Sequence, residues 1–393
     1  MTTHLQESDG ATVEVGPVAH GGHCVARLDG RVVFVRHALP GERVTIAVTD
    51  TTHDSFWRAD AVDILEPSPD RVTSRCPVSG PGKCGGCDFQ HVSLPGQRRL
   101  KAQVLAEQLD RLAGVPWDGE VEPVASPGTE DGLGWRTRMR YHVDEQGRAG
   151  LRRHRSHEIQ PLPAGGCPIA HPATPSVVDR AWTPGGELLA LTEVSAPVVV
   201  GATTASDDAE IVEHAAGREW RLAVDGFWQV HPGAADTLVR AVLEGLHPEP
   251  GERAFDLYCG VGLFTGALVD AGVRAWGVEW DRRAIGYARG NVPGAKFTAG
   301  KVERALRTLP KRTDLVVLDP PRTGAGKDVV DAVVSRRPRA IAYVACDPAA
   351  LARDVARAAR SGYRPTTIRA FDLFPMTHHV EAVVILEPTT GAS

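Results

Sequence analysis

The sequence predicts a multidomain α/β protein that begins with a small β-barrel and ends in a mixed sheet. From about residue 250, short apolar runs such as "TDLVVLDPP" and "AIAYVACDP" alternate with helical segments, which is typical of a parallel sheet in an α/β layer fold. The last two apparent strands, "RPTTIRAFDLF" and "HHVEAVVILEP", are joined by only about half a dozen residues, too few for a parallel crossover. We therefore expect the final strand to run antiparallel. Residues 11–66 alternate in short β-branched runs, which favours an OB-like barrel.

The length of 393 residues favours two or three domains. Between the barrel and the final sheet we expect a central α+β domain, because "PGQRRLKAQVLAEQLDRLAG" has helical apolar spacing and residues 134–165 look like strands. Residues 168–220 carry no clear pattern. The predicted domains are 1–68, 69–225 and 226–393.

Composition indicates a soluble protein. Apolar residues make up 42% and charged residues 24%, and no run is long enough to cross a bilayer. The start, "MTTHLQESDG", lacks the basic and apolar segments of a signal peptide, so we expect a cytoplasmic protein without membrane partners. With a net charge of −5, any basic surface must be local.

The first strand of the final sheet leads into a glycine-containing loop, "DLYCGVGLFTG". Glu279 ends the next strand, where a carboxylate can accept the hydroxyl groups of a ribose. The third glycine, Gly266, comes one position late for a dinucleotide fingerprint, so an adenosine ligand without a pyrophosphate, such as S-adenosylmethionine (SAM), fits better. A purely structural turn is the alternative.

A second carboxylate is expected at the same edge of the sheet. Asp319 follows a buried strand in "LDPPRTGAG", and the two prolines stiffen the loop after it. Ligands of open α/β sheets bind at the carboxyl ends of the strands, so Asp319 and Glu279 should face one site. The alternative for Asp319 is a helix cap.

Cys346 is placed to act as a nucleophile. It ends the strand in "IAYVACDP", and Asp347 and Pro348 then provide an N-cap and a first helical residue. We expect the positive end of that helix to lower the pKa of the thiol. An antiparallel last strand begins at the same edge, so Glu381 can face Cys346 and act as a base. A buried, inert cysteine is the alternative.

With these features the sequence resembles the RNA uracil-5-methyltransferases. The blocks "DLYCGVG", "DPPRTG", "YVACDP" and "FPMTHHVEAV" look like that family's signatures, and "GRVVFVRHALPGERV" looks like its RNA-binding TRAM barrel. The resemblance covers most of the chain and implies a SAM-dependent methyltransferase fold. It implies Cys346 as the nucleophile and Glu381 as the base. The SAM-contacting residues that it implies are Gln229, Tyr258, Glu279 and Asp319. Leu263 and Asp347 stand at positions where members of that family commonly carry asparagine.

Four cysteines form a candidate metal site. In "CPVSGPGKCGGCDFQH" three cysteines are spaced by seven and then two residues, and "GGCPIAHP" supplies a fourth; from spacing alone, zinc and an iron–sulfur cluster are both plausible. An odd total of seven cysteines argues against a disulfide framework. The resemblance favours a [4Fe–4S] cluster. Its ligands would be Cys76, Cys84, Cys87 and Cys167.

Arginines gather in "WRTRMRYHVDEQGRAGLRRHRS", where Arg136, Arg138 and Arg140 would share one face of a strand. We interpret them as phosphate contacts, with a solvated arginine face as the alternative.

These observations together predict a monomeric RNA 5-methyluridine methyltransferase. Ribosomal RNA of the large subunit is the favoured substrate, and the tRNA T-loop is the alternative. Two rivals are a non-catalytic RNA-binding protein and an amino-group methyltransferase. The second is disfavoured because Arg322 replaces the aromatic residue that its motif requires.

Overall fold

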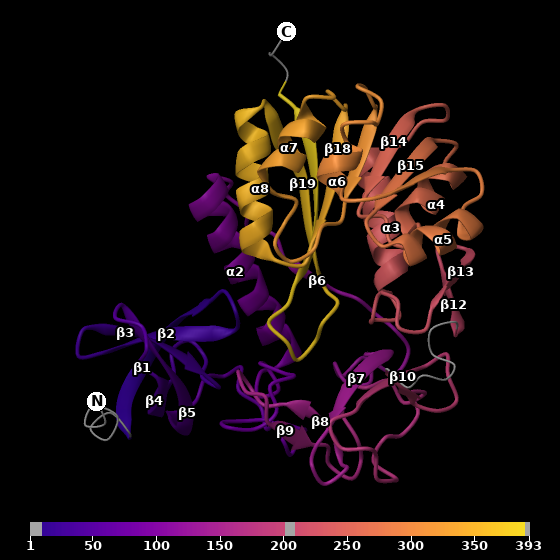
Figure 1. The fold of residues 1–393 in the computed structure, drawn as a ribbon. Helices are drawn as coiled ribbons and strands as arrows, with labels where there is room; N and C mark the ends of the chain where they lie inside the picture. Colours follow the sequence, from indigo (N-terminus) through magenta and orange to yellow (C-terminus); the bar gives the residue numbers. More distant parts are fainter. Residues whose placement is uncertain (1–9, 201–208, 390–393) are drawn as a thin grey trace.

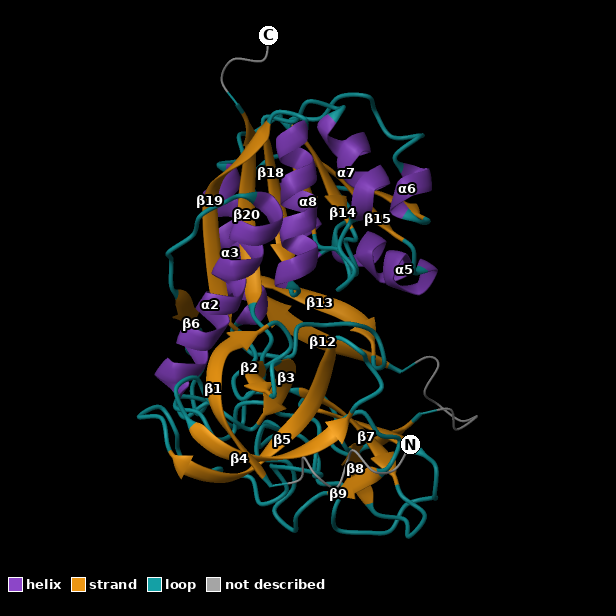
Figure 2. Cartoon of the chain, turned by 90° about the vertical axis from the view of Figure 1, so that its left-hand side faces the viewer, coloured by secondary structure: helices purple, strands orange, loops and turns teal. Residues whose placement is uncertain are grey.

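The structure, a computed structural model, describes residues 10–200 and 209–389 and contains three regions (Figure 1). A barrel lies beside a central group of short strands, and a large sheet covered by helices lies above both. In a view turned by a quarter, most helices gather around the large sheet, while the barrel and the central strands occupy the other half (Figure 2). Residues 1–9, which carry most of the N-terminal segment considered above, and residues 201–208 of the unassigned stretch lie outside the described residues.

The N-terminal region is the expected closed five-stranded barrel, with the order β1-β2-β3-β5-β4. Alternate residues such as Val33 and Val35 fill its interior, as the period of a strand requires. Asp29 and Gly30 form a tight turn with φ of 49° and 80°, the left-handed conformation that suits a two-residue hairpin. The strands are β1 (Ala11–Ala19), β2 (His23–Leu28), β3 (Arg31–Arg36), β4 (Arg43–Asp50) and β5 (Phe56–Glu66).

The central region contains an antiparallel sheet with the order β11-β10-β7-β8-β9 and a separate β12–β13 hairpin. The sequence pattern at 134–165 predicted strands, and β7 to β9 lie within that range. The elements are β7 (Arg138–Val143), β8 (Ala149–Arg152), β9 (Ile159–Pro161), β10 (Glu187–Leu191), β11 (Val198–Val199), β12 (Glu210–Ala215) and β13 (Arg218–Ala223).

The predicted helix forms as α2 (Leu94–Ala113), capped by Ser93, whose side chain accepts a hydrogen bond from the Gly96 amide. It packs against a helix of the C-terminal region, and strand β6 (Val121–Pro123) pairs in parallel with a C-terminal strand. Periodicity identifies the apolar face of a helix but not the surface that covers it. The domain boundaries at 68 and 225 stay a prediction.

The C-terminal region is built on an eight-stranded sheet with the order β16-β15-β14-β17-β18-β20-β19-β6. The first five of these strands are parallel, and β20 is antiparallel to both of its neighbours, as the short connection predicted. The strands are β14 (Arg253–Leu257), β15 (Arg274–Glu279), β16 (Lys296–Ala299), β17 (Leu315–Leu318), β18 (Ala340–Ala345), β19 (Tyr363–Asp372) and β20 (Glu381–Pro388).

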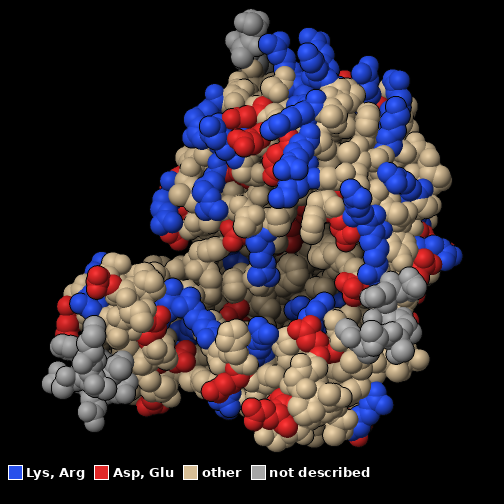
Figure 3. Space-filling view, viewed as in Figure 1, with Lys and Arg blue, Asp and Glu red and all other residues tan. Residues whose placement is uncertain are grey.

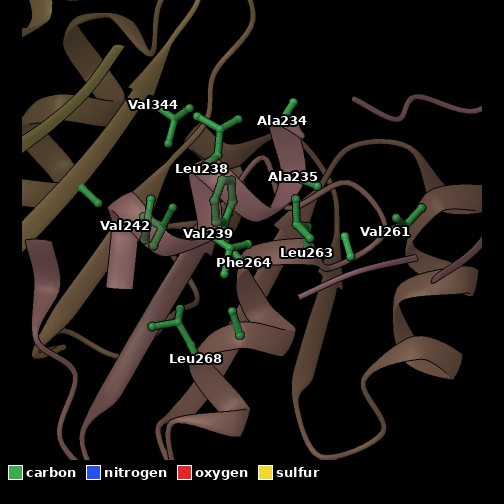
Figure 4. Close-up of a cluster of buried hydrophobic side chains, with 14 of the residues drawn as sticks. Ala234, Ala235, Leu238, Val239, Val242, Val261, Leu263, Phe264, Leu268 and Val344 are labelled. Atoms are coloured by element: carbon green, nitrogen blue, oxygen red, sulfur yellow. The ribbon is translucent and has the colours of Figure 1, made fainter. Parts of the chain in front are cut away.

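Helices cover both faces of this sheet. Strand β18 shows the arrangement: Ala342 and Val344 point into one hydrophobic cluster, and Ile341 and Tyr343 point into the other. The first cluster packs under α3 (Ala234–Leu246) and α4 (Leu263–Asp270) (Figure 4). The second includes side chains of α2, α6 (Val302–Ala305), α7 (Gly326–Val334) and α8 (Pro348–Arg360). Burial on both faces explains the continuous apolar runs that predicted a parallel sheet.

In the described parts of the chain, no helix combines the length and apolar character needed to cross a bilayer.

Candidate active site

A cavity of about 1200 Å³ opens where the three regions meet, and a hollow with Lys and Arg side chains around it is visible there (Figure 3). Its walls include Gly21 of the barrel, Arg136 and His154 of the central region, and the edge of the large sheet. The cavity brings together all six residues predicted for catalysis and SAM binding. They are Gln229, Tyr258, Glu279, Asp319, Cys346 and Glu381.

The topology of the sheet explains this convergence. Tyr258, Asp319 and Cys346 each follow the last residue of a parallel strand, and Glu279 is the last residue of β15. Parallel strands end at one edge of a sheet. Strand β20 runs in the opposite direction, so its first residue, Glu381, lies at that edge too.

The loop after β14 is shaped to lie close to a ligand. Tyr258 and Gly260 have φ of 71° and 52°, and the amide of Gly260 donates to a carboxylate oxygen of Glu279 at 3.3 Å. A side chain at Gly266 would place its Cβ 2.5 Å from the ring of Trp220. Gly266 therefore serves helix packing, which accounts for its unusual position in the glycine motif.

Buried carboxyl groups dominate the electrostatics of the cavity floor. Burial raises the pKa of Asp319 to about 7 and that of Asp256 to about 6, and Glu279 adds to both shifts. The second oxygen of Asp256, Oδ1, has no hydrogen-bond partner. Burial also raises the pKa of Glu381 well above its usual range. Acidic groups in such surroundings favour a cationic ligand, and SAM carries a positively charged sulfonium.

The pKa of the Cys346 thiol differs from the value expected from the sequence. Burial and, to a smaller extent, the neighbouring Glu381 raise this pKa to about 11, while Arg322 acts in the opposite direction. The predicted N-cap is confirmed, since Asp347 accepts a hydrogen bond from the Ala350 amide at 2.8 Å. The expected lowering of the thiol pKa is wrong, because desolvation and nearby carboxylates outweigh the helix terminus. A thiolate in this site needs an added positive charge.

Polar contacts fix the loop between β19 and β20, which ends directly before Glu381. Asp88, next to Cys87 in the chain, accepts from His378 at 2.6 Å and from Arg36 of the barrel at 3.1 Å. His379 contacts Arg322 at 3.2 Å. Sequence analysis did not identify this network, because its members are isolated polar residues from four different segments.

Two further contacts reach the same loop and the helix that starts beside Cys346. Lys101 of α2, fully buried, pairs with Asp372 at 2.6 Å and donates to the carbonyl of Phe374 at 3.0 Å. His20, at the tip of the β1–β2 hairpin, lies 3.1 Å from Asp347. The barrel therefore touches the residue directly after the candidate nucleophile.

We expect Gly22→Ala to reduce turnover about tenfold or more by displacing this loop. A Cβ at Gly22 would lie 2.7 Å from His378 Cβ and 3.2 Å from Asp88 Cβ, so the barrel hairpin or the loop must move. A misplaced catalytic group costs large factors in rate even when it lies far from the substitution. Steady-state methyl transfer to RNA at saturating substrate would measure the loss.

The matched control is Gly30→Ala. Gly30 also sits in a barrel hairpin with a similar φ, +80° against +78° at Gly22, but no atom lies within 4 Å of its added Cβ. Both variants carry the same backbone strain. Equal losses in the two variants would contradict a specific role for the Gly22 contact.

Two aromatic side chains at the mouth of the cavity were also missed by sequence analysis. Phe227 and Trp280 are 74% and 71% exposed and both line the cavity. These two residues lie outside any periodic apolar pattern, so the sequence could not show that their side chains are exposed at the cavity. Leu263, one of the noted departures, is buried in the hydrophobic cluster under α4.

The four cysteines of the candidate metal site line a separate cavity of about 230 Å³. Burial raises the pKa of Cys167 to about 11 and raises that of Cys87 further, and the other thiols add to both shifts, so the sulfurs lie near one another. Within residues 10–200 and 209–389, no three His, Cys, Asp or Glu side chains are grouped to hold a metal ion. The cavity is lined by Cys76, Cys84, Cys87 and Cys167 together with Gln90, Arg136 and Arg140.

The three alternating arginines do not form one RNA-facing surface. Arg138 is held inside the protein, where it donates to the carbonyls of Val224 and Gly226 and pairs with Glu213. Arg140 is exposed and pairs with Glu187 at 2.7 Å. Of the three, Arg136 alone borders both the large cavity and the cysteine cavity.

Comparisons with known proteins agree with this geometry. A family model described as "TRAM domain" matches residues 10–62, and one described as "tRNA (Uracil-5-)-methyltransferase" matches residues 309–389. The chain is 49% identical to an "Uncharacterized RNA methyltransferase" of Streptomyces avermitilis, over 96% of this chain and 98% of that protein. It is 36% identical to a protein of the same description from Bifidobacterium longum, over 95% and 96% of the two chains.

One solved structure matches almost the whole chain. It is the Pyrococcus abyssi tRNA (uracil-54, C5)-methyltransferase in complex with S-adenosyl-L-homocysteine. The TM-score is 0.70 at 24% identity, and the match covers 95% of this chain and 99% of that one. The likeness establishes that the two chains share a fold.

Proposed function

The chain belongs to the TRAM-containing RNA uracil-5-methyltransferases, and on this premise we propose that it methylates carbon 5 of one uridine in large-subunit ribosomal RNA through a covalent cysteine adduct. The observation that carries the proposal is that Cys346 and Glu381 border one cavity together with a set of buried carboxyl groups. A nucleophile and a base that act on one uracil ring account for Cys346 and Glu381, and a cationic methyl donor accounts for the buried carboxyl groups.

Methyl transfer to uracil needs activation because carbon 5 is a weak nucleophile. Cys346 sulfur, as the thiolate, adds to carbon 6, and the electron pair of the C5–C6 bond moves toward oxygen 4 as an enolate. Carbon 5 of this enolate attacks the methyl group of SAM. The bond between that methyl group and the sulfonium sulfur breaks, and S-adenosylhomocysteine leaves. Glu381 then takes the proton from carbon 5, the C5–C6 double bond forms again, and the C6–sulfur bond breaks.

The charges of the site favour this order of steps. The thiol of Cys346 has a pKa of about 11 before substrates bind, so little thiolate is present at neutral pH. A sulfonium in the cavity adds positive charge to that of Arg322 and favours both the thiolate and ionised Glu381. We therefore propose that SAM binds before the nucleophile becomes active, which limits side reactions of a free thiolate.

The target uridine must leave its stack to meet both groups, because the thiol and the carboxylate act on adjacent ring carbons. Four residues are proposed to bind SAM. Glu279 holds the ribose, Asp319 lies near the donor, and Gln229 and Tyr258 complete the walls.

A tRNA uridine is the second candidate substrate. It is supported by the match of residues 309–389 to the tRNA (Uracil-5-)-methyltransferase model. The combination of barrel and cysteine cluster favours ribosomal RNA. Mass-spectrometric mapping of 5-methyluridine in both RNAs, from cells with and without the protein, decides between them. Loss of one ribosomal site supports the proposal, and loss of no 5-methyluridine in either RNA overturns it.

We further propose that the four cysteines hold a [4Fe–4S] cluster with a structural role. The four thiols line one cavity, and four cysteine thiolates are the ligand set that such a cluster takes. When bound, such a cluster would tie the loop of Cys76, Cys84 and Cys87 to Cys167 of the central region. It would also fix Asp88, and through it His378.

Protein purified without oxygen should contain about four irons and four acid-labile sulfides per chain and be brown. Cys87→Ala should lose both signals and, because Asp88 is released, should also lower turnover. Cys24→Ala, which removes a thiol from the barrel core, is the control and should keep the iron. Stoichiometric zinc in place of iron and sulfide would reassign the site.

A further inference from the structure

Helix α8, which begins just after the candidate nucleophile, buries a carboxylate that the proposed mechanism does not use. Asp354 is 6% exposed, and one of its oxygens, Oδ2, accepts every hydrogen bond described next. The donors are the Tyr343 hydroxyl at 2.6 Å, the Ala325 amide at 2.8 Å and the Gly326 amide at 3.2 Å. A charge removed from water is costly unless such bonds are made, so the carboxylate holds its donors firmly. We call Asp354, Tyr343 and the two amides the loop anchor.

The two amides belong to the start of helix α7, whose N-cap residue, Ala325, has no side-chain oxygen to cap it. The first amides of a helix lack partners within it, and the positive end of the helix favours a carboxylate. Gly324, with φ of 85°, precedes them and leaves room for Asp354, because an added Cβ would lie 2.8 Å from Oδ2. The Tyr343 hydroxyl also lies 3.1 Å from the Ala325 amide. A strand, a helix and a loop therefore meet at one buried oxygen.

The loop anchor fixes one end of the loop that connects β17 to α7, residues 319–325. At the other end the Asp319 amide donates to the Leu257 carbonyl of β14 at 3.2 Å. Two prolines restrict the chain between these ends, and the Gly324 amide closes a turn on the Pro321 carbonyl at 2.8 Å. A short loop that is stiffened in this way and fixed at both ends passes a shift of either end to its middle.

Arg322 lies in the middle of this loop and lines the cavity together with Cys346 and Glu381. Four charged groups act on the pKa of the Cys346 thiol from three elements. They are Glu381 of β20, Asp319 and Arg322 of the loop, and Asp347 of α8. The three carboxyl groups raise that pKa, and Arg322 lowers it. Arg322 also acts against the raised pKa of Glu381. Both effects depend on where the loop holds the guanidinium.

We propose that Asp354 is a positioning residue for methyl transfer, which through the loop anchor holds the guanidinium of Arg322 toward Cys346 and Glu381. With the loop in place, a positive charge stands near the sulfur when it becomes a thiolate and near the carboxylate of the base. Because α8 carries Asp354 and begins beside Cys346, one helix sets the distance between the nucleophile and its counter-charge. The inference rests on the proposed function only for the roles of Cys346 and Glu381.

The test measures the reactivity of the Cys346 thiol and needs neither SAM nor RNA. The full chain is treated with iodoacetamide at about pH 9, and mass spectrometry follows alkylation of the peptide that contains Cys346. The pKa of the thiol, about 11, lies above this pH, so the rate is proportional to the small fraction of thiolate. Asp354→Ala should slow alkylation about tenfold, because displacing a nearby cation raises the pKa of a thiol. A protein that was merely loosened would expose the sulfur and react faster.

A double variant shows whether Asp354 acts through Arg322. Arg322→Gln alone should slow alkylation by a similar factor, and adding Asp354→Ala to it should cause no further loss. Two independent effects would instead multiply. Asp354→Asn keeps an acceptor oxygen for the two amides and should be slowed only about threefold or less.

Gly324→Ala disturbs the loop anchor from the side of the loop and leaves the carboxylate in the protein. Its added Cβ would lie 2.8 Å from Asp354 Oδ2, so this variant should also slow alkylation. The matched control is Gly362→Ala, at the end of α8. Gly362 has φ of +82° against +85° at Gly324, but the nearest atom lies 3.6 Å from its added Cβ. Both variants carry the same backbone strain, and Gly362→Ala should react like the unchanged protein.

Circular dichroism on heating shows which variants unfold cooperatively and are therefore folded at the start. Normal or faster alkylation in folded Asp354→Ala, or in folded Gly324→Ala, would overturn the proposal. A further loss when Asp354→Ala is added to Arg322→Gln would overturn it too.

This outcome is separate from that of the proposed function. A protein that forms 5-methyluridine while these variants are alkylated normally keeps its function, and Asp354 loses its positioning role. A protein that forms none, but shows the expected losses of alkylation, keeps the loop anchor as the arrangement that sets the reactivity of the thiol.

Discussion

RNA with 5-fluorouridine at the target position should become covalently attached to Cys346 in the presence of SAM. After addition of sulfur to carbon 6 and methyl transfer, carbon 5 carries a methyl group and a fluorine but no proton. Glu381 then has nothing to remove, the C6–sulfur bond cannot break, and the adduct accumulates to about one per chain. A band that resists denaturing electrophoresis, and mass spectrometry of the peptide that contains Cys346, would measure it.

Cys346→Ala should form no adduct and should lose methyl transfer by at least about 10⁴-fold, a loss of the size seen when a catalytic nucleophile is removed. It should still bind SAM, because no SAM-contacting role is assigned to this side chain. Cys24→Ala, which removes a buried thiol of the barrel core that does not line the cavity, is the matched control and should form the adduct normally. Release of an accepted fluorinated RNA without an adduct would contradict the covalent route.

Glu381→Gln should trap ordinary uridine RNA on the enzyme after methyl transfer. The amide is similar in shape to the acid but cannot take the proton from carbon 5, so the last step stalls. Turnover should fall by about 10²–10⁴, the usual contribution of a general base. With methyl-labelled SAM, the label should appear in a covalent complex of protein and RNA.

Glu387→Gln is the control for this variant. Glu387 lies on the same strand, β20, six residues after Glu381 and away from the cavity. It should turn over normally without accumulating the complex. If Glu381→Gln released methylated RNA at the normal rate, another group would have to be the base.

The sequence predicted the fold well where local patterns decide it. Alternation identified the barrel, and the connection between the last two strands was short enough to require an antiparallel β20. The same topology brought five of the six predicted residues to one edge, because strand ends converge whatever the side chains are; Gln229 reaches the cavity from the segment between β13 and α3. These inferences needed only the period of each element and the length of each connection.

Prediction failed where the surroundings of a residue decide its state. Cys346 stands at a helix start, which favours the thiolate, but burial by the surrounding structure, together with carboxyl groups from other strands, raises the pKa of the thiol instead. Arg138 shares a strand face with Arg140, yet a segment more than eighty residues later supplies carbonyl groups that hold it inside.

Strand β6 has a consequence for how this chain can be cut or assembled. It covers the edge of β19, and Lys101 of the preceding helix neutralises Asp372, which is 3% exposed. A fragment that starts at residue 226 would keep every catalytic group and still have an open strand edge and an isolated buried acid. Open edges promote aggregation, and an uncompensated buried charge costs about 3–5 kcal/mol. The catalytic half is therefore not an independent module, because a stretch of chain more than two hundred residues earlier completes its sheet edge and pairs its buried acid.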